Sequence, residues 1–73
     1  MTNVNAKGNF GYTPLHKAAR EGRQDIAELL IDKGAEINAR NNEGETPLDA
    51  ALEKYHQDLA AMLMAHGAKK GVD

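Results

Sequence analysis

The sequence contains no cysteine, serine or tryptophan, and its aromatic residues are one phenylalanine and two tyrosines. Without cysteine, the chain forms neither disulfides nor thiolate metal sites. Without serine or cysteine, it cannot assemble a Ser-His-Asp or Cys-His catalytic group. No glycine-rich phosphate-binding motif is present, because the glycines fall at predicted turns. These absences predict a protein that is not an enzyme and needs no cofactor.

Charge and hydropathy exclude further classes of function. The formal net charge is -2 and the positive side chains are scattered, whereas nucleic-acid-binding domains usually carry a basic stripe. The longest mostly apolar stretch, residues 59–65, is too short to cross a bilayer. The first residues lack the basic start and apolar core of a signal peptide. We therefore expect a cytoplasmic protein that binds neither nucleic acid nor a membrane.

The length of 73 residues allows one small domain, which we place at residues 1–73. A chain of this size buries only about 60% of the surface that its unfolded form would expose, so its core is thin. Such a domain gains stability from additional repeats or from a partner chain.

The chain contains an internal repeat. Displacing the sequence by 33 residues places identical residues opposite each other at predicted turns and helix starts, in the same order in both copies. We assign repeat 1 to about residues 8–40 and repeat 2 to about residues 41–73, with residues 1–7 as the tail of a preceding repeat. The matching segments are Asn5-Ala6 with Asn38-Ala39, Thr13-Pro14-Leu15 with Thr46-Pro47-Leu48, Gln24-Asp25 with Gln57-Asp58, and Gly34-Ala35 with Gly67-Ala68.

Each unit has the pattern of two helices joined by a turn. Thr13 can cap the first helix, because its hydroxyl accepts a hydrogen bond from a free backbone N–H. Pro14 suits the first helical position, where its missing N–H costs nothing. Gly22 is the expected left-handed residue after this helix. The apolar face of the helix is made of Leu15, Ala18 and Ala19, whose small members permit close packing.

The second helix of the first unit is expected to begin near Gln24-Asp25 and to end at Gly34. Ile26, Leu29 and Leu30 follow the spacing i, i+3, i+4, which predicts one buried stripe. The corresponding apolar residues of the second unit are Leu48, Ala51 and Leu52 on its first helix, and Leu59, Met62 and Leu63 on its second.

Two substitutions distinguish the second unit from the first. Asp49 replaces His16, and an acid three residues after a capping threonine can bond the N–H of the cap itself. Tyr55 replaces Gly22, although a bulky residue tolerates the left-handed conformation poorly. We therefore expect either a different turn in the second unit or a longer first helix there.

The segments TPLHKAA and ELLIDKGAEINA, at a period of 33 residues, resemble the ankyrin repeat, and TPLDAAL with AMLMAHGA is a looser match. The resemblance covers nearly the whole chain. It implies an all-α solenoid of stacked helix-turn-helix units with short β-hairpin tips. It also implies protein binding by a concave face that the tips and the first helices form, and an Asn38 side chain that bonds across the hairpin turn.

The two ends of the repeat array differ. Residues 4–7 match residues 37–40, so the chain begins with the end of a repeat whose helices are missing; it is either cut from a longer array or a minimal protein. The upstream side of the first unit would then expose apolar surface, which predicts a homo-oligomer formed through that side or, alternatively, an unstable monomer. The polar residues Gln57, Asp58, His66, Lys69 and Lys70 are typical of a terminal capping repeat.

The resemblance assigns partner binding to the tips and the first helices. Phe10 and Tyr12 flank Gly11 in the first tip, where they either anchor a partner or pack on their own or the neighbouring hairpin. Glu43 and Glu45 make the second tip acidic, which predicts a partner with an apolar pocket beside basic residues. The candidate partner-binding residues are Asn9, Phe10, Tyr12, Arg20, Glu21, Arg40, Asn42, Glu43, Glu45, Glu53 and Lys54.

The histidines and acids are residue types that can bind metal ions. Asp49, Glu53 and His56 could share one helix face, but di-metal bundles need two Glu-x-x-His pairs and further glutamates. We therefore expect a solvated helix face and no metal. His16 is expected to be structural, bonded within the turn that begins at Thr13, and His56 and His66 are expected at the surface.

Overall fold

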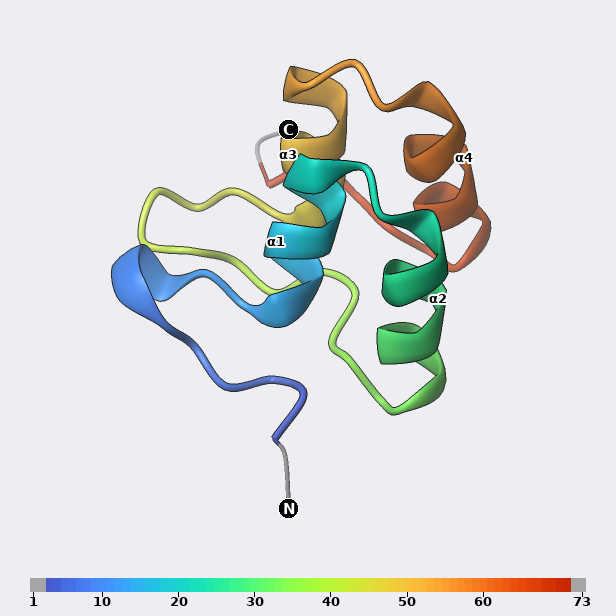
Figure 1. The fold of residues 1–73 in the computed structure, drawn as a ribbon. Coiled ribbons are helices and arrows are strands. Elements are labelled where there is room, and N and C mark those ends of the chain that lie inside the picture. The colour runs from blue at the N-terminus through green and yellow to red at the C-terminus, as the bar shows by residue number, and fades with distance from the viewer. Residues whose placement is uncertain (1–2, 72–73) are drawn as a thin grey trace.

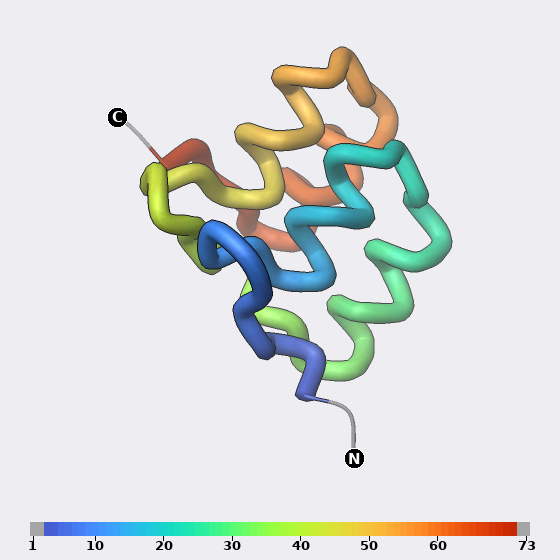
Figure 2. Tube along the Cα trace, turned by 60° about the vertical axis from the view of Figure 1, so that its left-hand side comes forward, coloured from blue at the N-terminus to red at the C-terminus, as the bar shows by residue number. Residues whose placement is uncertain are grey.

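The computed structural model describes residues 3–71 and contains four α-helices in two layers within them (Figure 1). The inner layer consists of α1 (Pro14–Glu21) and α3 (Pro47–Glu53), and the outer layer of α2 (Gln24–Asp32) and α4 (Gln57–Ala65). Each pair forms one unit, and the tip that precedes it projects sideways from the inner layer (Figures 1 and 2). The all-α architecture and the two helix pairs confirm the sequence prediction.

The tips contain no strand within the described residues. A 3-10 turn, η1 (Asn9–Gly11), occupies the first tip. Single backbone hydrogen bonds close the two tips: Gly8 N–H donates to Tyr12 O at 2.8 Å, and Asn41 N–H donates to Glu45 O at 2.9 Å. The predicted β-hairpins are therefore tight turns, with further backbone bonds inside them from Gly11 N–H to Gly8 O at 3.1 Å and from Gly44 N–H to Asn41 O at 3.0 Å. None of the helices in residues 3–71 has both the length and the apolar character that crossing a membrane requires.

The first helix of each unit begins at a reciprocal cap, as predicted. The hydroxyl of Thr13 accepts from His16 N–H at 3.3 Å, and that of Thr46 accepts from Asp49 N–H at 3.4 Å. In return, the N–H of Thr46 donates to the Asp49 carboxylate at 3.0 Å, so Asp49 closes the predicted capping box. Both helices have proline at their first position, where no donor is lost.

The core lies between the layers and extends through both units. Alanines on the facing sides of α1 and α3 let the two inner helices approach closely, and leucines from α1, α3 and α4 fill the remaining space. The buried apolar residues of this core are Leu15, Ala18, Ala19, Ala27, Leu48, Ala50, Ala51, Leu59, Ala60 and Leu63.

The predicted buried stripe on α2 is wrong in part. Ile26 is 41% exposed and Leu29 is 55% exposed, while the buried residue of this helix is Ala27. The equivalent of Ile26 in the second unit is Leu59, which is 2% exposed. The difference arises because the first unit covers this side of the second, whereas no described segment covers the same side of the first. Helical spacing alone could not distinguish the two cases.

The turn after α3 also departs from expectation. Tyr55 has φ = 62° and thus adopts the same left-handed conformation as Gly22, whose φ is 71°. Its helix is shorter than α1, ending at Glu53 rather than at the equivalent of Glu21. Tyr55 is 84% exposed, so no packing compensates for its backbone strain. The turn geometry is therefore imposed by the packing of the helix pair and not by the residue in it.

Asparagine side chains connect successive loops of the solenoid. The Asn5 carboxamide donates to Gly34 O at 3.2 Å and accepts from Glu36 N–H at 2.6 Å. Asn38 repeats this arrangement with Gly67 O at 3.2 Å and Lys69 N–H at 2.7 Å. Asn38 thus bonds to the loop that follows α4 in the second unit. The expected bond across its own hairpin turn is replaced by this bond between units.

His16 joins the first unit to the second. Thr13 N–H donates to its Nδ1 at 3.1 Å, and because a backbone N–H is only a donor, this nitrogen carries no proton. The proton therefore lies on Nε2, which donates to Glu45 O in the second tip at 2.7 Å. The predicted structural role within the Thr13 turn is confirmed, and the bond to the second tip is an addition that the sequence did not indicate.

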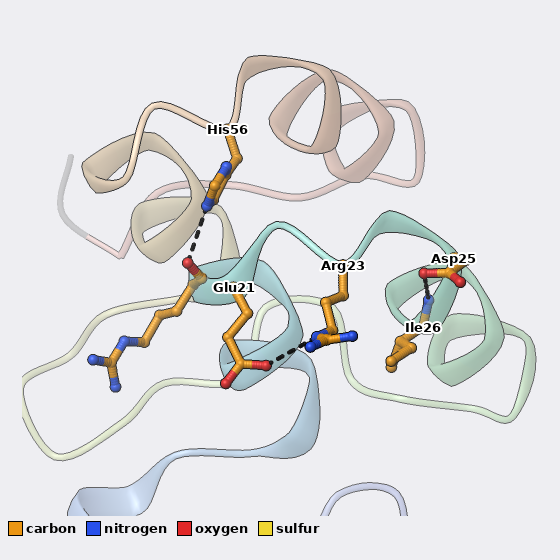
Figure 3. Close-up of polar contacts among 6 residues, drawn as sticks. Glu21, Arg23, Asp25, Ile26 and His56 are labelled. Carbon is orange, nitrogen blue, oxygen red and sulfur yellow. Dashed lines mark hydrogen bonds and ion pairs between the residues drawn. The ribbon is translucent and has the colours of Figure 1, made fainter.

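His56 forms a second connection between the units. It follows α3, and its Nε2 donates to Arg20 O, 3.0 Å away, at the end of α1 (Figure 3). Its imidazole lies so close to Gly22 that a Cβ there would be 2.7 Å from the ring. His56 is half-buried at the surface, and its bond between the units is an addition to the expected surface position. His66 is exposed, as expected.

Replacing Tyr55 by glycine should stabilise the protein. The substitution removes left-handed strain of about 1–2 kcal/mol, partly offset by the conformational entropy of glycine, so we expect a net gain of about 0.5–1 kcal/mol. Urea unfolding followed by circular dichroism measures this. The matched change at the equivalent position, Gly22→Ala, should lose about 1–3 kcal/mol because it adds strain and a contact with His56. A Tyr55→Gly variant less stable than the wild type would contradict this account.

Stability should fall as the pH drops through the range in which His16 becomes protonated. Burial lowers the pKa of His16 below its usual 6.5, and the bond to Glu45 O opposes this only in part. The unfolded chain therefore binds the proton more tightly, so the stabilisation from neutral His16 is complete above pH 6.5 and declines as the pH falls toward the lowered pKa. Protonation of Nδ1 would also remove the bond from Thr13 N–H.

The test compares His16→Gln with the wild type in urea unfolding between about pH 5 and pH 8. At the high end, the variant should be less stable by about 1–3 kcal/mol, because buried hydrogen bonds are lost. This difference should shrink toward the acidic end. His66→Gln, at an exposed position, should follow the wild type throughout. A difference for His16→Gln that stays constant with pH would refute the assignment.

Candidate functional site

The two tips stack on each other and form one continuous ledge beside the inner helices. Asn42 N–H donates to Phe10 O at 2.9 Å, which joins the tips through their backbones. Gly11 has φ = 76°, and a Cβ at this position would lie 2.6 Å from Oδ1 of Asn42. Glycine is therefore required here both for its conformation and for the close approach of the second tip.

The second tip is braced internally, whereas the first is not. The side chain of the buried Asn41 accepts from the N–H groups of Glu43 and Glu45, both at 2.9 Å, and donates to the Glu45 carboxylate at 3.0 Å. Gly8 occupies the equivalent position in the first tip and has no side chain to do this. In that tip the chain turns instead through Phe10, whose φ is 60°.

The two aromatic residues of the first tip have different surroundings. Tyr12 is half-buried, with its ring edge-on to His16 at 5.6 Å between centroids and the Arg20 guanidinium 5.2 Å from its ring centre. Phe10 is 74% exposed. Of the two roles that the sequence left open, Tyr12 packs on its own unit and Phe10 remains available to a partner.

A groove of about 730 Å³ lies between the first tip, the exposed side of α1 and the end of α3. Its helical wall is formed by Lys17, Arg20 and Glu21, which lie at i, i+3 and i+4 and so share one face of α1. The N-terminal segment and the first tip form the opposite side. The lining residues are Ala6, Lys7, Gly8, Asn9, Phe10, Tyr12, Thr13, Pro14, Lys17, Arg20, Glu21 and Lys54.

A smaller hollow of about 350 Å³ lies between the two tips and Arg20. It is lined by Phe10, Tyr12, Arg20, Asn41, Asn42 and Glu43. Phe10, Tyr12 and Arg20 also line the larger groove, so the two hollows form one continuous surface on which Phe10 stands at the junction.

The structure brings together most of the residues that the sequence assigned to partner binding. Arg40, Glu45 and Glu53 line neither hollow. The Glu45 carboxylate is held by Asn41, and the Arg40 carbonyl accepts from the Lys7 ammonium at 3.0 Å. Six of the predicted residues line the larger groove, namely Asn9, Phe10, Tyr12, Arg20, Glu21 and Lys54, and Asn42 and Glu43 line the smaller hollow.

Lys7 and Lys17 belong to the groove although sequence reasoning did not single them out. The helical spacing between Lys17 and Arg20 could have identified Lys17, because residues three apart lie on one helix face. Lys7 carried no such signal, since its position depends on how the N-terminal segment folds back beside the first tip.

Basic side chains dominate the larger groove. Lys7, Lys17, Arg20 and Lys54 are all exposed, and Glu21 is the acidic residue among those that line it. The Glu21 carboxylate is paired with Arg23, 3.3 Å away, on the side toward α2 (Figure 3). The groove is therefore locally positive on a chain whose formal net charge is -2.

The acids and histidines considered as metal ligands do not converge. The Asp49 carboxylate accepts from Thr46 N–H at 3.0 Å and from Gly71 N–H at 2.7 Å. His56 bonds to Arg20 O instead. Within residues 3–71, no three His, Asp or Glu side chains are grouped so that they could hold a metal ion. Asp49 and His56 instead cap a helix and connect neighbouring segments through hydrogen bonds.

Comparisons with known proteins agree with the geometry. A family model described as ankyrin repeats (3 copies) matches residues 1–73. The BTB/POZ domain and ankyrin repeat-containing protein NPR3 of Oryza sativa subsp. japonica is 51% identical over 35 residues, which cover 48% of this chain and 6% of that protein. The chain thus spans a small part of the length of this relative.

Ankyrin repeats are generally modules of protein–protein interaction and typically have no enzymatic activity. The stacked helix pairs, the projecting tips, the threonine-proline caps and the family match over the full sequence lead to one assignment: this protein belongs to the ankyrin-repeat family.

Proposed function

We propose that this protein binds a partner protein through the surface formed by its tips and inner helices. The observation that carries the proposal is Phe10, an aromatic residue that is 74% exposed at the junction of the two hollows. Aromatic side chains are frequent anchors of protein interfaces, because they bury a large area at small entropic cost. The stacked repeats supply the rigid surface on which such an anchor is effective.

The conformation of Phe10 supports this role. Its φ of 60° is unfavourable for a bulky residue, and its exposed ring gains no packing energy in return. Strained backbone that no internal contact repays is most often found at functional positions. Tyr12 and Arg20 hold the neighbouring surface in place through the stacking of the guanidinium on the ring.

Phe10→Ala should weaken partner binding by about 30-fold or more, which corresponds to about 2 kcal/mol for an interface anchor. The side chain is exposed, so the thermal unfolding midpoint should change little. The measurement is affinity capture from extracts of the source cells, followed by titration of each retained protein. Met64→Ala is the matched control, because Met64 is also exposed at 53% but lies on α4, away from both hollows. Undiminished binding by Phe10→Ala together with Tyr12→Ala would refute the proposal.

A second candidate function is assembly with other copies of the chain. Ile26 and Leu29 on α2 are exposed at 41% and 55%, while their counterparts Leu59 and Met62 pack into the core. The second unit packs this side against the first unit, and no segment within residues 3–71 covers the same side of the first unit. Contiguous exposed apolar surface is typical of interaction sites.

If this surface drives assembly, the protein should form dimers or larger species as its concentration rises. Light scattering after size exclusion measures the mass, and circular dichroism on the same samples reports folding. Leu29→Glu should shift the equilibrium toward monomer by about tenfold or more, because a charge at an apolar contact must be desolvated. Glu28→Gln, on the same helix, is the control. A folded monomer at every concentration excludes the assembly function and leaves the partner-binding function intact.

A further inference from the structure

We propose that the larger groove receives an acidic segment of a partner protein, with an apolar side chain of that segment placed against Phe10. This inference rests on the proposed partner-binding function and adds the chemistry of the partner. It follows from three features of the groove: the excess of cations along its walls, the aromatic and proline surface between them, and the position of the remaining acids.

The cations of the groove come from three different parts of the chain. Lys7 lies in the N-terminal segment, Lys17 and Arg20 lie on α1, and Lys54 follows α3. Among residues 3–71 the single ion pair joins Arg23 to Glu21, so no described carboxylate lies within 4.0 Å of these four cations. Like charges gathered on one surface repel one another, and a bound polyanionic segment relieves that repulsion.

The apolar part of the groove lies among these cations. Phe10, Tyr12 and Pro14 line it together with the four basic residues. The lysine stems add further apolar surface, because their ammonium groups reach water while their methylenes remain beside the groove. A volume of about 730 Å³ accommodates several side chains of an extended segment. The chemistry therefore fits acidic residues on either side of one aromatic or aliphatic residue.

The acidic second tip does not change the sign of this groove. The Glu45 side chain is turned into its own tip, where Asn41 donates to it at 3.0 Å. Glu43 lines the smaller hollow and not the larger one. The basic partner surface inferred from these two acids in the sequence is therefore replaced by an acidic one. Glu43 should also orient the bound segment, because its carboxylate repels acidic residues and keeps them out of the smaller hollow.

The test is a selection from a random library of 12-residue displayed peptides against the folded protein. We expect the recovered peptides to be rich in aspartate and glutamate around one aromatic or aliphatic residue. Their affinity should fall by about tenfold between low and physiological salt, since exposed charges are screened. Lys17→Glu with Lys54→Glu should weaken these peptides by about tenfold and should recover lysine- or arginine-rich peptides when the selection is repeated.

Lys33→Glu with Lys70→Glu is the matched control, because it makes the same change in net charge at exposed positions outside both hollows. It should leave the affinity of the selected peptides within about twofold of the wild type. Circular dichroism of each variant verifies folding, and a labelled oligothymidylate is titrated in parallel.

The outcomes separate the inference from the function on which it rests. Neutral or basic peptides that lose binding with Phe10→Ala would overturn the acidic partner while leaving the partner-binding groove in place. Peptides unaffected by any groove variant, or an empty selection, would overturn both. Oligothymidylate that binds more tightly than the selected peptides and displaces them would assign the cations to nucleic acid instead. If Lys33→Glu with Lys70→Glu weakens binding as much as Lys17→Glu with Lys54→Glu, the loss of affinity results from the net charge of the protein and the inference is overturned.

Discussion

The two hydrogen bonds of the His16 ring hold the structure together at the point where its parts meet. One ring nitrogen accepts from Thr13 N–H at the start of α1, and the other donates to Glu45 O in the tip of the next unit. A single fully buried side chain therefore fixes a helix start, orients the tip that follows and sets the spacing between units. The bond from Thr13 N–H requires the neutral ring, whereas Nε2 can donate to Glu45 O in either protonation state; burial lowers the pKa of His16 and so favours the neutral form.

In the second unit a different side chain closes the helix cap and bonds to the next segment of the chain. Asp49 replaces the histidine, accepts from Thr46 N–H and also from Gly71 N–H in the C-terminal segment. Histidine is suited to reach a carbonyl, because its second nitrogen is a donor, whereas a carboxylate is suited to reach an N–H. The substitution therefore matches the backbone group that each unit must bind, and it maintains the cap in both.

The residues with a left-handed backbone conformation are of two kinds, glycines in close contact with a neighbour and bulky residues that are exposed. Gly22 and Gly11 adopt positive φ where a side chain would collide with His56 or Asn42. Phe10 and Tyr55 adopt it with bulky side chains that remain exposed. At Phe10 this conformation places an aromatic ring at the edge of the basic groove. At Tyr55 no described contact accounts for it.

The sequence by itself determined the local structure and the family. The Thr13-Pro14 pair recurs after 33 residues as Thr46-Pro47 and specifies the helix starts, and Gly34 recurs as Gly67 and marks the turns, because capping and left-handed turns are local properties of the chain. The resemblance to ankyrin repeats supplied the candidate partner-binding positions, and most of these line the two hollows.

The sequence predicted an exposed apolar surface on the upstream side of the first unit, but only the tertiary structure decided which side chains form it and what charge the groove carries. Ile26 and Leu59 occupy equivalent positions in similar helices, yet one is exposed and the other buried, because burial depends on the neighbouring unit. The basic groove combines Lys7, Lys17 and Lys54 from separate segments, and the Glu45 carboxylate is bonded to Asn41 within its own tip and lines neither hollow. Such properties depend on side chains that meet across long sequence separations, which no local pattern records.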